Sequence, residues 1–144
     1  MRALARIAPA LWVAASLAAA GCGTVTYVLQ EYGGEPRPAD SVAIVRITPH
    51  DPLHVSSVDG DPLDVRLDED TRVHVEMLPG VHVLGVYRPD AEIPIEQKVR
   101  FLASPGRTYA VVMAEAPPGS ATPWTGRVYE IDRSSGVRVH DATR

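Results

Sequence analysis

The sequence predicts an all-β fold, an antiparallel β-sandwich of about seven or eight short strands, preceded by a signal-peptide helix. Three observations support this fold class. Short stretches in which apolar and polar residues alternate, as in a strand with one buried face, recur along the chain. Turn-forming proline and glycine residues separate these stretches at short intervals. After residue 22, no stretch has an apolar stripe at helical spacing.

The chain begins with the features of a secretory signal peptide, in their usual order. Arg2 and Arg6 carry positive charge, residues 7–20 are almost wholly apolar, and small residues close the segment. The apolar stretch is shorter than the roughly 18–20 residues that a membrane-spanning helix needs. We therefore expect residues 1–21 to be a cleaved signal peptide, the alternative being a retained membrane helix.

Cys22 is the only cysteine of the chain, so it cannot form an intramolecular disulfide. It follows Leu17-Ala-Ala-Ala-Gly21, which resembles the lipobox of bacterial lipoproteins, with Ala19 where leucine is commoner. The resemblance implies cleavage before Cys22 and attachment of two or three acyl chains to this cysteine. Several acyl chains would hold the protein firmly on a membrane, whereas one myristoyl chain gives only marginal binding. Cleavage by the general signal peptidase, leaving a free thiol, is the alternative.

By the same resemblance, Gly23 in place of aspartate implies export to the outer membrane, facing the periplasm, if the host is Gram-negative. Loss of Arg2 and Arg6 would leave 12 positive side chains against 18 negative ones, a net charge of −6. An acidic chain of this kind has no overall electrostatic attraction for nucleic acid or for anionic lipid head groups. The expected membrane contact is therefore made through the acyl chains on Cys22.

Residues 22–40 are expected to be the lipidated N-terminus and a tether, because turn and polyproline chemistry dominates their second half. Within them, residues 27–29 are a candidate short strand. The β-sandwich domain is expected over residues 41–132. Residues 133–144 are a C-terminal tail or an edge strand, with pairing or fraying at residues 137–139 both left open.

The first strands of the domain are predicted between residues 41 and 67. The stretch 41–47 is apolar on both faces, which indicates a strand covered on both sides. A short strand is expected at residues 53–58, followed by an Asp59-Gly60 pair typical of a tight hairpin turn. Residues 63–67 alternate between apolar and charged side chains, which predicts a half-buried strand.

The clearest hairpin of the sequence is predicted at residues 72–87, around the Pro79-Gly80 turn. The favoured register places Met77 opposite His82, Val75 opposite Leu84 and Val73 opposite Val86. Three directly opposed pairs would then share one buried face, with His82 as its only polar member.

The second half of the domain is predicted to hold three more strands. In residues 93–103 the apolar residues Ile93, Ile95, Val99, Phe101 and Ala103 share one parity, and Pro105-Gly106 then turns the chain. Strands are expected at residues 109–113 and 128–131. A loop rich in proline, glycine, serine and threonine joins them around Trp124.

Several turn and core phrases of the domain occur together in a recognisable order. They are Val58-Asp59-Gly60, Leu78-Pro79-Gly80-Val81-His82 and Gly106-Arg107-Thr108-Tyr109, with Tyr32-Gly33 and Pro36-Arg37-Pro38 closer to the N-terminus. Over roughly residues 32–131 the chain resembles small bacterial lipoproteins with a PEGA-like or carboxypeptidase-regulatory-like, transthyretin-type β-sandwich. The resemblance implies a non-catalytic accessory domain. Val81 and Val83 depart from it, because polar residues are common at these positions.

Metal binding is a weak interpretation of the histidines and acidic residues. His74, His82 and Glu76 flank the Pro-Gly turn, but in the favoured register the two histidines point to opposite faces. The Asp59-Gly60-Asp61 turn with Asp64 offers oxygen ligands at spacings that suit calcium, but it lacks the glycine and terminal glutamate of an EF-hand. We expect a solvated acidic turn, no metal and no other cofactor.

Hydrolytic catalysis has little support in the sequence. Ser104, Ser134 and Ser135 lie in predicted turns without the Gly-x-Ser-x-Gly context of a nucleophile elbow. His54 near Asp51 has the composition of a base with an orienting carboxylate, but no nucleophile is placed for it. The chain is therefore not expected to be an enzyme.

The favoured functional surface is the outer face of the predicted hairpin. Val83 and Tyr87, with Val81 at the turn, would form an exposed apolar patch of the kind that marks partner contacts. Burial of these residues under a second sheet or under the loop around Trp124 is the alternative. The sequence thus predicts a lipid-anchored envelope protein with a protein-interaction or structural role and an unidentified envelope partner. The alternative is a periplasmic ligand-binding or hydrolytic module with a pocket between the sheets.

Overall fold

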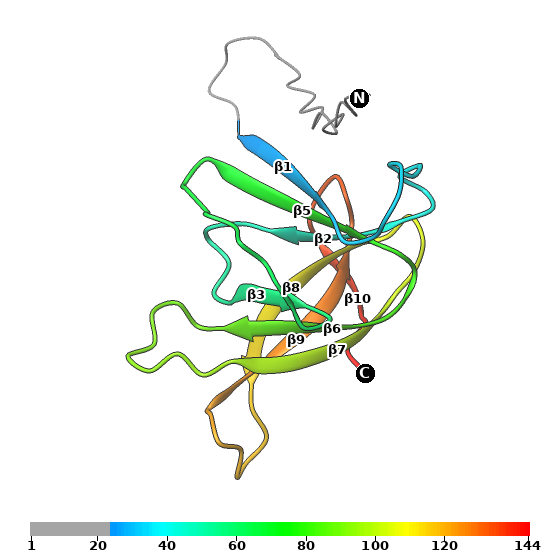
Figure 1. Ribbon diagram of the computed structural model, residues 1–144. Helices are drawn as coiled ribbons and strands as arrows, with labels where there is room; N and C mark the ends of the chain where they lie inside the picture. The colour runs from blue at the N-terminus through cyan, green and yellow to red at the C-terminus, as the bar shows by residue number, and fades with distance from the viewer. Residues whose placement is uncertain (1–23) are drawn as a thin grey trace, which may run out of the picture.

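The computed structural model describes residues 24–144, which contain ten strands in two sheets and no helix (Figure 1). The predicted signal peptide and Cys22 lie outside the described residues. The strands are β1 (Val25–Gln30), β2 (Ala43–Ile47), β3 (His54–Val58), β4 (Asp61–Pro62), β5 (Thr71–Met77), β6 (Gly80–Tyr87), β7 (Gln97–Ala103), β8 (Thr108–Glu115), β9 (Trp124–Ile131) and β10 (Arg138–Asp141). The predicted all-β, sandwich-like class is confirmed, with more strands than expected.

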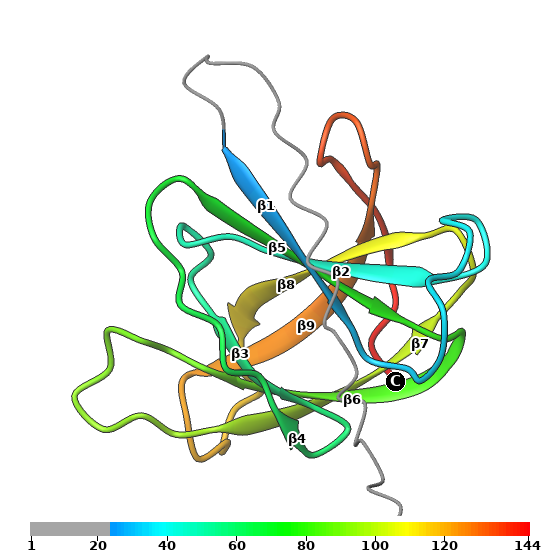
Figure 2. The same cartoon turned by 45° about the horizontal axis from the view of Figure 1, so that its top comes forward.

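The larger sheet has six strands in the order β1-β5-β2-β8-β9-β10, and the smaller has four in the order β4-β3-β6-β7. Both views show β1, β5 and β2 on one side of the molecule and β3, β6 and β7 on the other (Figures 1 and 2). The sheets are not purely antiparallel, because β1 runs parallel to β5 and β2 runs parallel to β8. The other strand pairs are antiparallel.

Valine is the commonest residue of the core between the sheets. The largest core side chains with almost no exposed surface are Tyr109, Phe101, Leu53, Met77 and Leu84, followed by Val45, Val73, Val75, Val86 and Val128. β-branched side chains favour extended backbone and pack well on a pleated surface, so the same residues promote the strands and fill the core.

The predicted hairpin at residues 72–87 is wrong, although both of its strands exist. β5 lies between β1 and β2 in the larger sheet, and β6 lies between β3 and β7 in the smaller one. The Pro79-Gly80 segment therefore carries the chain from one sheet to the other, and Gly80 has a φ of 146°, which favours glycine. The predicted inward residues are correct, because both strands face one core from opposite sides.

Two further strand predictions need correction. Residues 63–67 alternate between half-buried and exposed as predicted, but β4 ends at Pro62. The Leu63 amide still donates to the carbonyl oxygen of Ser56 on β3 (2.9 Å), and the rest of the segment is not assigned to a strand. Its apolar side chains pack against the core at the edge of the sandwich. Ile93 and Ile95 are exposed by 75% and 48%, and β7 begins only at Gln97.

The N-terminal part of the domain is more ordered than a tether. Residues 25–30 form β1, an edge strand of the larger sheet, with Val25 opposite Thr71 and Gln30 opposite Glu76. The Val25 amide also donates a hydrogen bond to the carbonyl oxygen of Asp70 (2.8 Å). The folded unit therefore begins close to the expected lipidation site.

The C-terminal residues join the two sheets. After β10, the Ala142 amide donates to the carbonyl oxygen of Val128 on β9 (2.8 Å). On the other side, the Leu102 amide of β7 donates to the carbonyl oxygen of Ala142 (3.1 Å), and the Arg144 amide donates to that of Arg100 (2.8 Å). Because these bonds use the outer edge of β7, that edge is no longer open for pairing with another chain.

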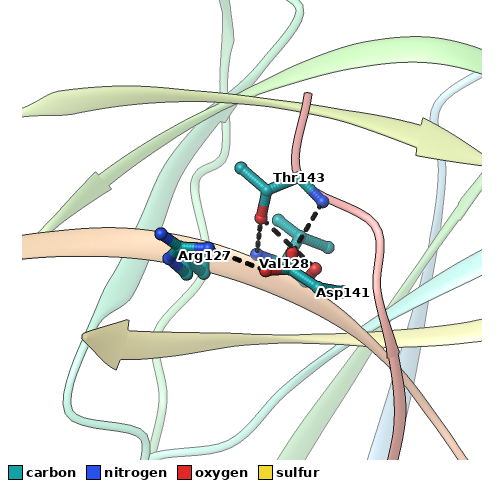
Figure 3. Close-up of polar contacts among 4 residues, drawn as sticks. All are labelled: Arg127, Val128, Asp141 and Thr143. Atoms are coloured by element: carbon teal, nitrogen blue, oxygen red, sulfur yellow. Dashed lines mark hydrogen bonds and ion pairs between the residues drawn. The ribbon is translucent and has the colours of Figure 1, made fainter.

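Side chains reinforce this C-terminal closure (Figure 3). The Val128 amide donates to Oγ1 of Thr143 (3.0 Å), and the Arg127 guanidinium donates to the Asp141 carboxylate (2.8 Å). Partial burial tends to raise the pKa of Asp141, but hydrogen bonds from Thr143 and Arg127 outweigh it and hold the pKa below its ordinary value. Residues 138–144 are thus part of the sandwich and not a free tail.

Candidate functional site

The outer face of β6 and β7 carries an apolar patch made by Val81, Val83 and Leu102, hereafter the valine patch. Val81 lies opposite Leu102 in the strand register, and Val83 lies opposite Arg100. Val81 and Leu102 are exposed by 49% and 36%, and Val83 is half-buried. In the described residues this face is thus open to solvent at Val81 and Leu102 and partly covered at Val83.

Tyr87 does not belong to this patch. Its ring meets the edge of the His54 ring from β3, with the centroids 5.8 Å apart. Between Tyr87 and Val83 on the same face lies Gly85, where a β-carbon would collide with the Ser57 and Ser56 hydroxyls. The surface predicted from Val83 and Tyr87 is therefore divided into two separate parts.

A small polar network lies at this dividing line. The Ser56 hydroxyl and the Lys98 ammonium both contact the Glu96 carboxylate, the latter at 2.5 Å. Lys98 also donates to the Ser57 hydroxyl (3.3 Å). The hydrogen bonds from Lys98 and Ser56 hold the pKa of Glu96 below its ordinary value, so this carboxylate stays charged.

Beneath the valine patch, His82 connects the β3–β4 turn to β6. One ring nitrogen contacts the Asp59 carboxylate (2.6 Å) and the other contacts the carbonyl oxygen of Leu78 (2.7 Å). The second oxygen of Asp59 accepts the Val83 amide (2.8 Å). His82 is therefore a structural residue, and its ring packs on Phe101 inside the core.

The predicted Asp59-Gly60 turn is confirmed, and it shows how Asp59 is used. Asp59 and Gly60 both have positive φ, 51° and 93°, as a two-residue hairpin turn of this type requires. Since both Asp59 oxygens already accept hydrogen bonds, the acidic turn has no free carboxylate at its first position. Within residues 24–144, no group of three His, Cys, Asp or Glu side chains is arranged to hold a metal ion.

The two histidines of the weak metal hypothesis lie far apart in the topology. His74 is on β5 in the larger sheet, and His82 is on β6 in the smaller one. His82 faces the core, whereas His74 shares the outer face of its sheet with Arg46. The prediction that they do not converge on one ion holds for a different reason, since they belong to different sheets.

The residues considered for hydrolysis have other partners. Asp51 accepts the Thr48 amide (2.7 Å), and His54 packs on Tyr87. The hydroxyls of Ser134 and Ser135 donate to Asp132 (2.6 and 2.8 Å), whose pKa these bonds lower strongly. An acceptor with such a low pKa is a poor general base, because it does not take up a proton near neutral pH.

The hollows that the structure offers lie at the surface and edges of the sandwich. The most apolar of them, about 310 Å³, lies between β1 and the 63–67 segment and is lined by Tyr27, Leu29, Val65 and Val73 among others. Fully buried side chains fill the centre of the sandwich. A second hollow, of about 210 Å³, is lined by residues of both sheets, among them Ile47 of β2, Val55 of β3 and Tyr87 of β6, so a ligand pocket between the sheets stays a prediction.

Leu102 is the residue of the valine patch that sequence reasoning missed. Its neighbours Phe101 and Ala103 are buried in the core, so Leu102 points outward with Lys98 and Arg100. The signal in the sequence is a large apolar residue at one of the alternate positions of the strand that otherwise hold charged side chains.

Comparison of the chain with models of known protein families, with curated protein sequences and with solved structures gave no match. The resemblance to PEGA-like lipoproteins therefore stays a prediction. Between residues 24 and 144 there is no helix with the length and apolar character needed to cross a membrane.

Proposed function

We propose that the protein is a non-catalytic lipoprotein of the bacterial cell envelope, anchored by acyl chains on Cys22, whose β-sandwich presents a surface to another envelope protein. In a Gram-negative host the domain would face the periplasm from the outer membrane. The proposal rests on two features. One is the lipobox-like sequence, and the other is a fold in which the polar residues considered for metal binding or hydrolysis make structural contacts.

The observation that carries the proposal is the position of β1. Only Gly23 and Thr24 stand between Cys22 and Val25, where the larger sheet begins. A lipid on Cys22 would therefore hold the sandwich next to the bilayer, because no long flexible linker separates them. The remaining faces would be turned toward the periplasm, within reach of other envelope proteins.

The valine patch is the proposed contact surface. Exposed apolar side chains that form one group mark partner contacts, whereas scattered single ones need no explanation. Arg100 and Lys98 border the patch on β7, so the contact would combine an apolar centre with a charged rim.

Ligand binding is the second candidate, and the groove beside β1 is the observation that favours it. Its volume of about 310 Å³ reaches the lower end of the range typical of small-molecule sites, and Tyr27 in its lining is 56% exposed. Binding of an apolar fluorescent dye that Leu29→Asp abolishes, with the melting temperature kept, would favour this role.

Cys22→Ala is expected to abolish lipid attachment. In cells given labelled palmitate, the natural chain should incorporate label and lose residues 1–21, as intact mass measurement would report. The Cys22→Ala chain should carry no label, since the acceptor atom is missing, and Gly23→Ala should behave like the natural chain. Equal labelling of the Cys22→Ala chain, or release of the natural chain by a carbonate wash, would contradict the anchor.

Val83→Asp is expected to abolish partner capture while lowering the free energy of unfolding by no more than about 1 kcal/mol, because Val83 is half-buried on an outer face. Crosslinking in living cells, detergent extraction and mass identification would measure capture. The matched control is Val28→Asp on the larger sheet, where the valine is 56% exposed. Capture of the same proteins by the Val83→Asp chain would remove the valine patch from the proposal.

A further inference from the structure

The outer face of the larger sheet gathers positive side chains from three elements. Arg46 of β2 lies opposite His74 of β5 in the strand register, and Arg72 is on the same face of β5. Arg133 comes from the loop between β9 and β10, and its charge acts on His74. We call Arg46, Arg72, His74 and Arg133 the arginine cluster.

The three guanidinium groups of this cluster have no ion-pair partner among the described residues. Arg66, Arg88, Arg107 and Arg127 each lie within 4.0 Å of a carboxylate, but Arg46, Arg72 and Arg133 do not. The chain as a whole carries a net charge of −4, so acidic side chains are in excess elsewhere. Like charges placed together without counter-charges repel each other, and an added anion would remove this repulsion.

His74 reports the positive field of the cluster. Burial lowers its pKa, and the charges of Arg133, Arg46 and Arg72 lower it further. Glu76 on the same strand acts in the opposite direction but is itself hydrogen-bonded by the Tyr32 hydroxyl (3.1 Å). The effect of Glu76 on the pKa of His74 is smaller than that of each of the three arginines, so the net field at His74 stays positive.

Arg46 and Arg72 also line one hollow of about 230 Å³. Thr24, Thr48, Thr71, Pro49, His50 and Glu69 complete its lining. Two arginines against the single carboxylate of Glu69 give the lining a net positive charge, and the threonines add hydroxyl donors, a combination that suits a phosphate group. A β-carbon at Gly136 would lie 3.2 Å from the Arg46 guanidinium, so the backbone of the β9–β10 loop packs against this group and restricts it.

We propose that the hollow between Arg46 and Arg72 binds a phosphate group, and that a phospholipid head group supplies it in the cell. The phosphate chemistry rests on the hollow and the arginine cluster alone. The lipid source rests on the proposed function, because Thr24 lines the hollow and lies two positions after Cys22. An anchor there would bring the hollow to the bilayer surface, where the local positive charge outweighs the acidic net charge.

The test uses the purified full chain in neutral detergent micelles and two probes, inorganic pyrophosphate and phosphatidylglycerol added to the micelles. Melting temperature is followed against probe concentration at constant ionic strength, since salt screens non-specific attraction. Phosphatidylcholine at equal amount is the lipid control. We expect phosphatidylglycerol to raise the melting temperature of the natural chain and phosphatidylcholine to raise it less.

Arg72→Gln and Arg46→Gln should each weaken the apparent affinity by about tenfold or more, the loss expected for one charge-assisted hydrogen bond. Arg72 is exposed, so its replacement should leave the fold intact. Arg100→Gln on the smaller sheet removes the same charge and should leave the affinity unchanged. As a second readout, the nuclear magnetic resonance signal of the His74 ring should titrate at higher pH with the probe bound, because the anion offsets the field of Arg133, Arg46 and Arg72.

The outcomes separate the two sources of phosphate. A shift with pyrophosphate and none with phosphatidylglycerol would keep the phosphate site and overturn the lipid source. No shift with either probe, or an equal loss of affinity in the Arg100→Gln chain, would overturn the site. Because lipidation at Cys22 is measured separately by mass, failure of the anchor and failure of the phosphate site are distinguishable.

Discussion

Phe101→Ala is expected to lower the free energy of unfolding by about 3–5 kcal/mol, the largest effect among the substitutions considered. Phe101 on β7 is fully buried. Its ring packs on His82 of β6 and on Tyr109 of β8, with centroid distances of 6.1 and 5.3 Å. Because Tyr109 belongs to the other sheet, truncation would leave a cavity between the two layers and remove their aromatic contact.

Urea denaturation followed by tryptophan fluorescence would measure this loss, since Trp124 is buried in the same core. Leu102→Ala is the matched control, because Leu102 is the next residue on β7 but points outward. It should cost less than about 1 kcal/mol. A cost for Phe101→Ala below that of Leu102→Ala would mean that the aromatic contact between the sheets is not central to the core.

Asp59→Ala is expected to cost about 1–3 kcal/mol, which is large for an exposed turn residue. The substitution removes the acceptor for the His82 ring at 2.6 Å and for the Val83 amide at 2.8 Å. It also places alanine at a φ of 51°, a conformation that aspartate and asparagine tolerate better. The turn and the strand beneath the valine patch should therefore loosen together.

Thermal unfolding of three chains would test this expectation. Asp59→Asn keeps an acceptor oxygen and tolerates positive φ, so it should retain most of the stability. Asp61→Ala removes a neighbouring exposed carboxylate and should cost about 0.5 kcal/mol or less. Equal losses for Asp59→Ala and Asp61→Ala would show that the hydrogen bonds of Asp59 do not stabilise the fold.

The net charge of the protein and the local charge around Arg46 and Arg72 have opposite signs. Net charge alone predicts no attraction to anionic head groups. Arg46 and Arg72 come from strands separated by two others in sequence, and they meet only because β2 and β5 are neighbours. A local field depends on which strands pair, so composition cannot predict it.

The sequence by itself determined the inward residues of the best-patterned strands and the tight turn after β3. Alternation identified Val73, Val75 and Met77 as inward, and the Asp59-Gly60 pair identified a tight turn, because both depend only on local geometry. The lipobox around Cys22 is likewise a feature of sequence alone, and its anchor stays a prediction.

Only the tertiary structure decided which strands are neighbours. Alternation of apolar and polar residues predicts which face of a strand a residue occupies, but not which strand lies beside it. The patterns of β5 and β6 are therefore equally compatible with one hairpin and with strands in two separate sheets. The choice depends on the packing of the whole core, in which Phe101 and Tyr109 bring the layers together. The valine patch with Leu102 and the arginine cluster follow from that choice, since each joins residues that are distant in sequence.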